Sequence, residues 1–154
     1  MSAPTSHTYH PDFFEPDERP DVLFGCIPRR LFFDHSALIE VARTGIPGHW
    51  LACITDSTGL HEAIGVALGM TVNQLDDACR SEFLDSRTSE TILDLARVLS
   101  RCLSVWESQE LAYEWLMHPV TALNGHSPIS LLDTFEGRHW IAEVLRKIEG
   151  GDFS

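Results

Sequence analysis

The chain has 154 residues and a hydrophobic fraction of 44%, so it can fold as one domain or two very small ones and bury a core. Its formal net charge is −12, and residues 1–104 (15 acids, 8 bases) and 105–154 (8 acids, 3 bases) are both acidic. This charge disfavours unassisted tight binding to nucleic acid or to an anionic membrane, and it suits a basic protein partner.

The cysteine spacing, the N-terminal sequence and the length of the apolar runs indicate the cellular location. The four cysteines are widely spaced, with no CxxC pair and no zinc-like spacing. The N-terminus lacks a charged segment followed by an apolar stretch, so no signal peptide is predicted, and no apolar run is long enough to cross a bilayer. We therefore expect a cytoplasmic protein with reduced thiols and no membrane contact.

Residues 1–30 are predicted to form an extended or flexible leader. The first twenty are rich in Pro, Ser, Thr and acids, and residues 22–27 could form a short strand or an extended segment packed on helices. His7 and His10 are close in sequence, but a histidine pair alone does not make a metal site. We therefore predict no bound metal.

The next region, residues 31–104, is predicted to be helical. Residues 31–43 favour a helix in which Asp34 is a possible cap, and a second apolar segment follows Pro47. The clearest helix in the chain spans residues 88–106, with Thr88 or Ser89 as its cap. Its apolar face could serve both the core and a dimer contact, and its members recur at helical spacing: Ile92, Leu95, Ala96, Leu99, Leu103 and Trp106.

Residues 56–80 have the pattern of a helix-turn-helix. Gly65 would let the two helices approach, Gly69 would make the turn, and Thr71 would cap the second helix, on which Leu75 packs inward. The expected arrangement is therefore the one that many DNA-binding proteins use.

The charge around this motif argues against DNA binding. Residues 56–94 contain eight acids against two arginines, and Asp76 and Asp77 lie on the would-be recognition helix. A scaffold or dimerisation role for the motif is thus favoured over DNA binding. The side chains that could still contact DNA, if an arginine or a partner protein supplies positive charge, are Thr71, Asn73, Gln74 and Arg80.

The last fifty residues divide into three further helices, each with one apolar face. Ser108 can cap a helix that runs to about Met117, Ser127-Pro128 is a helix start, and Thr134 can cap the final helix. Gly150-Gly151 would end that helix and leave a short tail, residues 152–154. We predict a small helical module here.

A set of residues in this module matches a known family in order and spacing: Ala112, Trp115-Leu116, Pro119, Leu123, Gly125, Pro128, Leu131-Leu132, Gly137, Val144-Leu145, Ile148 and Gly150. The pattern resembles the C-terminal toxin-binding domain of the Xre/MbcA/ParS antitoxins, which are paired with RES-domain toxins. Gly45-Ile46-Pro47, followed by an apolar helix, is similar to the entry to the helix-turn-helix region of the same family. At positions where the family commonly carries arginines, this chain has Asn73, Asp77 and Ala78.

The resemblance implies an all-α fold in which a helix-turn-helix-containing N-terminal region (31–104) precedes a toxin-binding domain (105–154). It implies an antitoxin that blocks a cognate RES-domain toxin acting on NAD, within a complex that contains an antitoxin homodimer. A DNA-binding autorepressor is the alternative. The residues expected to contact the toxin are Trp115, Arg138, Trp140, Arg146, Lys147, Gly150, Gly151, Asp152 and Phe153.

Several of these residues also have a plainer interpretation. Trp115 and Trp140 fall at helical spacing, where aromatic side chains usually pack in the core. Arg138, Arg146 and Lys147 could be ordinary solvated charges. The sequence has no GxSxG, P-loop, HExxH or glycine-rich dinucleotide motif, so we expect neither an enzyme nor a bound cofactor.

Overall fold

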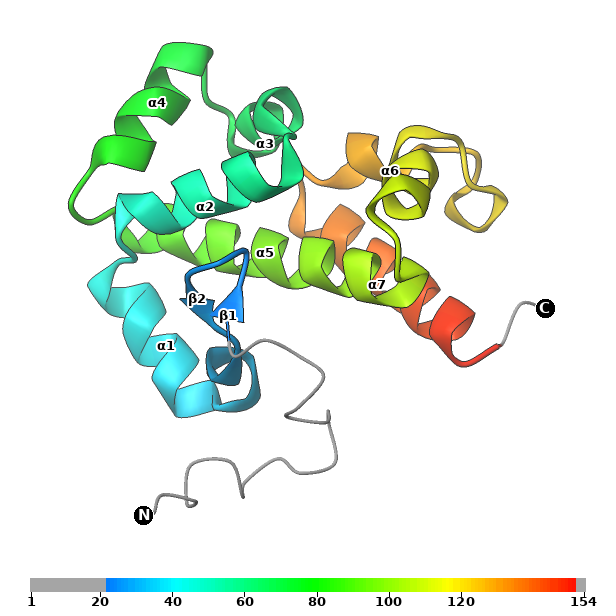
Figure 1. Ribbon diagram of the computed structural model, residues 1–154, viewed down its shortest axis with the longest axis horizontal. Coiled ribbons are helices and arrows are strands. Elements are labelled where there is room, and N and C mark those ends of the chain that lie inside the picture. The colour runs from blue at the N-terminus through cyan, green and yellow to red at the C-terminus, as the bar shows by residue number, and fades with distance from the viewer. Residues whose placement is uncertain (1–21, 152–154) are drawn as a thin grey trace.

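The computed structural model describes residues 22–151, which fold into a helical protein with one very small hairpin (Figure 1). This confirms the predicted helical class. The elements in chain order are β1 (Val22–Leu23), β2 (Ile27–Pro28), the 3-10 helix η2 (Arg29–Phe33), α1 (His35–Thr44), α2 (Gly48–Thr58), α3 (His61–Leu68), α4 (Val72–Arg80), α5 (Ser86–Trp106), α6 (Gln109–Met117), the 3-10 helices η3 (Thr121–Leu123) and η4 (Pro128–Leu131), and α7 (Phe135–Glu149).

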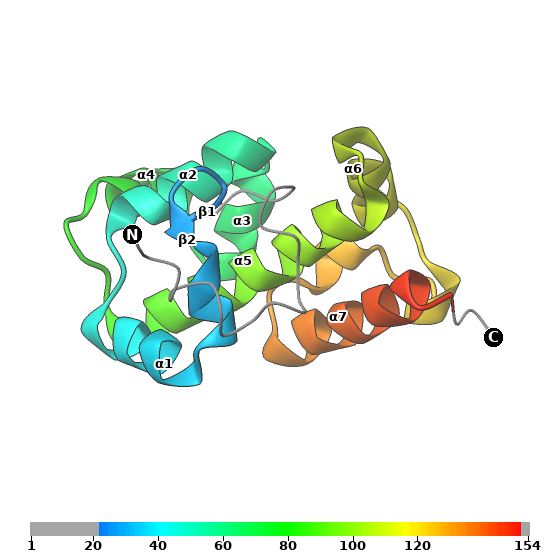
Figure 2. The ribbon, with the colours of Figure 1, turned by 60° about the horizontal axis from the view of Figure 1, so that its bottom comes forward.

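Helix α5 is the centre of the molecule. It packs against α1 and α3 of the N-terminal region and against α6 and α7 of the C-terminal region, so both regions are built on one helix (Figure 2). Each large apolar side chain buried here contributes roughly 1.5–3 kcal/mol. The buried apolar residues of α5 are Ile92, Leu93, Leu95, Ala96, Val98, Leu99 and Cys102.

The predicted apolar face of α5 is therefore covered within a single chain. Four of its six expected members are fully buried, and only Leu103 and Trp106 are half-buried. A dimer contact through this face stays a prediction. Packing within one chain leaves little of the face exposed for such a contact.

One buried cluster runs from Leu23 in the hairpin to Leu145 in α7. The predicted boundary between residues 104 and 105 falls inside α5. The N-terminal and C-terminal regions thus share a helix and a core in this fold.

Capping side chains begin most of the helices as expected. Thr71 and Gln74 form a reciprocal capping box at α4, and Ser108 and Thr134 accept backbone N–H groups at α6 and α7. The predicted helix, turn and helix are present as α3 and α4, and Gly69 adopts the left-handed conformation between them. That this pair is a helix-turn-helix of the DNA-binding kind stays a prediction.

The predicted cap of α5 was wrong. Asp85, rather than Thr88 or Ser89, is the N-cap, and its carboxylate accepts both the backbone N–H and the hydroxyl of Thr88. Ser89 is instead fully buried, where its hydroxyl accepts the Ile46 N–H at 2.9 Å. The Asp85 carboxylate satisfies two donors of Thr88 at once, so α5 begins about one turn before the predicted start.

The start of the first predicted helix was also wrong. Residues 29–33 form the separate 3-10 helix η2, and α1 begins only after Asp34. Asp34 accepts the Ala37 N–H at 3.0 Å, and an N-cap residue has extended backbone, here φ −130°, so no continuous helix can pass through it.

The short hairpin brings together two cysteines that are distant in sequence. Cys26, between β1 and β2, is disulfide-bonded to Cys53 on α2, so the expectation of four reduced thiols is wrong for this pair. Cys79 and Cys102 are free, and burial raises the pKa of the Cys102 thiol to about 12. The cytoplasmic location stays a prediction. No helix within residues 22–151 is long and apolar enough to cross a membrane.

Candidate functional site

The C-terminal unit, α6 to α7, is held together by close packing at Gly137. A Cβ at this position would lie 2.0 Å from the Leu131 carbonyl oxygen, so only glycine lets α7 approach η4 this closely. Thr134 caps α7 by accepting the Gly137 N–H at 2.9 Å. The start of α7 is therefore fixed by sterics and by a cap at the same place.

Arg138, one of the expected toxin contacts, points into the protein. It is 6% exposed, its Nε donates to an Asp94 carboxylate oxygen at 2.6 Å, and its Nη1 donates to the Leu132 carbonyl at 2.9 Å. A buried guanidinium needs such partners, because unpaired burial of its charge would be very costly. Arg138 therefore joins α7 to α5 and has little surface to offer a partner.

The two tryptophans expected at the interface are half-buried core anchors. Trp115 lies 6.1 Å from Trp106 between ring centroids, and Trp140 lies 6.4 Å from His126. Both pack against the main buried cluster. This placement agrees with the packing interpretation and leaves each only a partly exposed edge.

The end of α7 carries the exposed residues of the expected set. Arg146 and Lys147 are exposed, and Gly150 and Gly151 follow them, with Gly151 at φ +77°. The helix end is fastened to α5 by an ion pair of 2.6 Å between Arg101 and Glu149. Asp152 and Phe153 lie outside the described residues.

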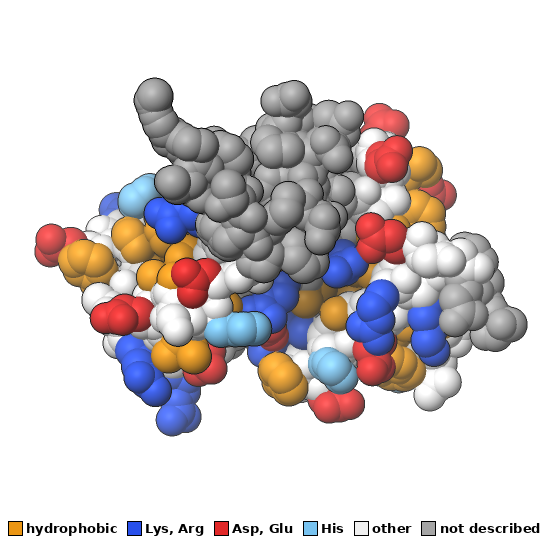
Figure 3. Space-filling view, turned by 90° about the horizontal axis from the view of Figure 1, so that it is seen from below, with side chains coloured by type: hydrophobic (Ala, Val, Ile, Leu, Met, Phe, Trp, Pro, Cys, Tyr) orange, Lys and Arg blue, Asp and Glu red, His pale blue; other side chains and the backbone are white. Residues whose placement is uncertain are grey.

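The lower face of the molecule shows this distribution of charge. In Figure 3, Lys and Arg side chains appear toward the right-hand end, where α7 ends, and also at the left-hand end, in both places among acidic and apolar ones. The end of α7 is thus an exposed, partly basic surface on a rigidly held helix.

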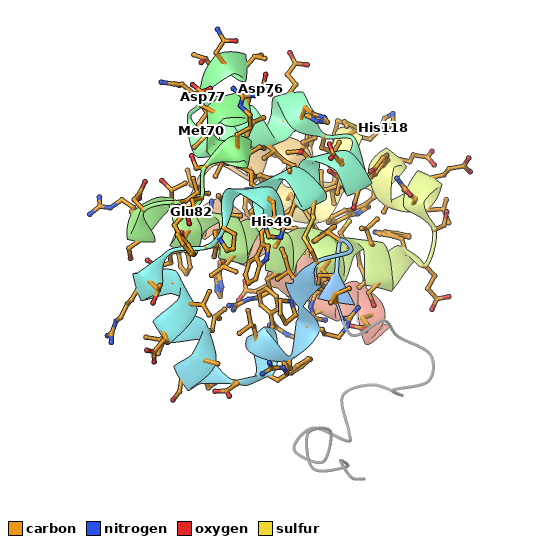
Figure 4. All side chains as sticks on the ribbon, turned by 60° about the vertical axis from the view of Figure 1, so that its left-hand side comes forward. His49, Met70, Asp76, Asp77, Glu82 and His118 are labelled. Carbon is orange, nitrogen blue, oxygen red and sulfur yellow. A yellow bond between two sulfur atoms is a disulfide. The ribbon has the colours of Figure 1, made fainter. Side chains whose placement is uncertain are left out.

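The four candidate DNA contacts lie together on α4, and all are exposed. Thr71 and Gln74 use their side chains in the capping box, and Arg80 donates to the Asp77 carboxylate at 2.7 Å. Asp76 and Asp77 lie at the outer edge of the molecule (Figure 4). The arginine of α4 is therefore paired with an acid of its own helix.

Sequence reasoning missed an exposed surface on α6. Leu111 and Met117 are 50% and 47% exposed, and the exposed carboxylates Glu110 and Glu114 lie beside them. The available signal was the charge distribution, because residues 102–137 contain no Lys or Arg. The described residues hold no group of three His, Cys, Asp or Glu side chains that could bind a metal.

Comparison with known proteins identifies the C-terminal unit. Residues 103–151 match the family described as the antitoxin Xre/MbcA/ParS C-terminal toxin-binding domain. The C-terminal unit is therefore similar to the toxin-binding domain of the Xre/MbcA/ParS antitoxins, as the motif pattern predicted. The family's description names a toxin-binding role, in line with the expectation of a binding protein rather than an enzyme.

A curated relative supports the same assignment. It is named "Prs ADP-ribosylating antitoxin", comes from Sphingobium sp. (strain YBL2), and is 31% identical over 93 residues. The alignment covers 54% of this chain, and the chain spans 57% of the relative's length.

Proposed function

We propose that the protein is the antitoxin of a type II toxin–antitoxin pair, and that it neutralises a RES-domain toxin acting on NAD. The match of residues 103–151 to a toxin-binding domain carries this proposal. The relative's name adds support, since it couples an antitoxin with ADP-ribosylation, a reaction that uses NAD as its donor. Stoichiometric binding suffices for neutralisation, so no catalytic group is required of this chain.

The end of α7 and the residues that follow it are proposed to block the toxin's NAD pocket. Gly137 and the buried Arg138–Asp94 pair hold α7 against η4 and α5, which limits the conformational entropy lost on binding. The exposed Arg101–Glu149 pair adds a weaker contact near the end of the helix. Gly151 lets the backbone turn and approach a narrow pocket. Asp152 would then take the place of an anionic phosphate group, and Phe153 would be an apolar anchor.

The exposed cations of α7 have a smaller part in this proposal. Arg146 and Lys147 could pair with acids on the toxin, but exposed pairs contribute only about 0–1 kcal/mol each. Most of the affinity should therefore come from apolar contacts, and the tail should supply the blockade. In the complex the antitoxin is proposed to be a homodimer.

A DNA-binding autorepressor is the second candidate, because α3 and α4 are two short helices joined by a turn at Gly69. This candidate is less favoured than the antitoxin proposal. Arg80 is paired with Asp77, and the exposed acids of α4 would repel DNA phosphates.

A truncation after Ile148 tests the proposed blockade. The full chain and the shortened chain would be mixed with purified RES-domain toxin from the same genome, and both complex formation and NAD consumption would be measured. We expect both to bind, but only the full chain to suppress NAD consumption. Failure of the full chain to bind the toxin would overturn the proposed function, and full protection by the shortened chain would overturn the blockade by the tail.

A further inference from the structure

The toxin-binding domain is divided into an acidic part and a basic end. Residues 102–137 contain five acids and no Lys or Arg. The domain's cations all come later, on α7, where Arg138 is buried and only Arg146 and Lys147 are exposed. The five acids of the first part are all exposed: Glu107, Glu110, Glu114, Asp133 and Glu136.

Helix α6 presents part of this acidic region on a well-anchored backbone. Ala112 and Leu116 are buried on its inner side, and the Tyr113 hydroxyl donates to the Thr58 carbonyl at the end of α2. Cys102 of α5 lies against the Ala112 carbonyl beneath it. The inner side of α6 is thus fixed to both α5 and α2, and in Figure 2 the helix stands at the far end of α5 from α1.

The outer side of α6 combines apolar and acidic groups. Glu114 follows Glu110 by four residues and Leu111 by three, and Met117 follows Glu114 by three, so these side chains form one continuous strip along the helix. Leu111 and Met117 are about half exposed. We call these four residues the α6 strip.

The carboxylates of the α6 strip are uncompensated within the described part of the chain. No ion pair among residues 22–151 involves Glu110 or Glu114. Asp77, Asp94 and Glu149, in contrast, each pair with an arginine. A strip with exposed apolar groups and free carboxylates matches a basic surface that has an apolar depression.

We propose that the α6 strip is a second docking surface for the toxin, one that recognises a basic and apolar region outside the NAD pocket. This inference rests on the proposed function. Leu111 is the anchor, and Glu110 and Glu114 accelerate association by attracting positive charge. A second copy of this chain fits the strip less well, because symmetric contact between two α6 helices would place the same glutamates against each other.

The two surfaces then have separate tasks. The α6 strip accelerates association with the toxin and slows its dissociation, whereas the end of α7 blocks the toxin's NAD pocket. A variant of the strip should therefore change binding without removing inhibition at saturating antitoxin.

The test uses the full chain carrying Glu110→Lys and Glu114→Lys, with Asp76→Lys and Glu82→Lys as the control of equal charge change on another exposed surface. Association and dissociation rates with the purified toxin would be measured at low and high salt. We expect the α6 variant to associate about tenfold more slowly at low salt, with a smaller difference at high salt, and the control to stay within about twofold of wild type. Leu111→Ala should mainly accelerate dissociation.

Milder variants and a second readout keep the outcomes distinct. Glu110→Gln with Glu114→Gln removes the charge without reversing it and preserves helix propensity, and circular dichroism verifies the fold. If these variants and the charge reversals all bind like the control, the α6 strip is not a docking surface, and the proposed function stands. If wild type itself fails to bind the toxin, the proposed function is wrong, and this inference with it.

Discussion

The helix pair α3–α4 and the C-terminal unit α6–α7 begin their helices with the same kinds of cap but differ in which charged side chains remain without a partner. Thr71 and Thr134 cap the second helix of each pair. On α4, Arg80 is paired with the neighbouring Asp77, so the surface offers no free cation to a phosphate. On α6, the carboxylates have no partner within residues 22–151. Caps and apolar spacing place a helix, whereas the function of its surface depends on which charges are neutralised.

The two regions also share a requirement for glycine at a close contact, and this gives the largest expected effect. Gly137→Ala would place a Cβ 2.0 Å from the Leu131 carbonyl oxygen, and Gly48→Ala would place one 2.2 Å from the Ala78 carbonyl oxygen. We expect each to lower the free energy of unfolding by about 3 kcal/mol or more, since backbone must move. Thermal unfolding followed by circular dichroism is the measurement.

The shape of these melting curves would show whether the two regions are independent. Because one core spans both, either substitution should lower a single transition for the whole chain. Two separate transitions, with only one displaced by each variant, would show that the regions unfold independently. Gly150→Ala is the control. A Cβ at this position would lie 3.5 Å from the Arg146 carbonyl oxygen, an ordinary contact distance, so we expect little change in stability.

The buried ion pair between the regions gives the next largest effect. Asp94→Asn leaves the Arg138 guanidinium, 6% exposed, without its counter-charge, and we expect a loss of about 2–3 kcal/mol because Asp94 itself keeps some contact with water. Asp77→Asn breaks an exposed pair on α4 and should change stability by less than about 1 kcal/mol. Chemical denaturation of both variants gives the comparison. Equal effects would mean that burial does not distinguish the two pairs.

Much of the fold could be predicted because the relevant signals are local. The caps Thr71, Ser108 and Thr134 and the turn at Gly69 lie within one helical turn of the backbone groups that they satisfy. Asp85 was missed because two adjacent hydroxyl residues, Thr88 and Ser89, looked like equally good caps.

The site was harder to predict, since its features depend on contacts between distant residues. Arg138 and Asp94 are 44 residues apart. Helical spacing places Arg138 on the face of Ile141 and Leu145, but nothing local identifies Asp94 as its partner. The disulfide between Cys26 and Cys53 likewise depends on where the hairpin lies on α2. The charge pattern of the sequence indicates the acidic region that contains the α6 strip. The exposure of Leu111, however, can be seen only in the folded structure.

Capping in the two regions gives a smaller, pH-dependent effect. Asp85→Ala should destabilise α5 by about 1 kcal/mol at pH 7, and Thr134→Ala should destabilise α7 by a similar amount. Hydrogen bonds from Thr88 lower the pKa of the Asp85 carboxyl below its usual value. Its contribution is therefore complete above the unfolded pKa of about 4 and disappears as pH falls through the lower folded value.

Denaturation of the two cap variants and wild type between pH 7 and low pH checks this sign. The difference between wild type and Asp85→Ala should shrink below about pH 4, whereas the difference for Thr134→Ala should not follow a carboxyl titration. A cap effect at Asp85 that stays constant down to low pH would contradict the assignment of its carboxylate as the helix cap.

The smallest effect is expected for DNA, where the comparison of the two regions is sharpest. The isolated protein should bind duplex DNA weakly or not at all at about 0.15 M salt, and Arg80→Ala should leave that unchanged. Arg80 already donates to Asp77, and the exposed Asp76 would face the phosphates.

Fluorescence anisotropy with a labelled duplex from the protein's own promoter is the measurement, and Asp76→Asn with Asp77→Asn is the informative partner variant. Removing both acids frees Arg80 and should produce measurable binding only at low salt, because one cation replaces few counterions. Nanomolar binding by wild type, lost on Asn73→Ala or Arg80→Ala, would instead make α4 a true recognition helix, and its acids would then be tolerated because base contacts, and not phosphate attraction, supply the affinity.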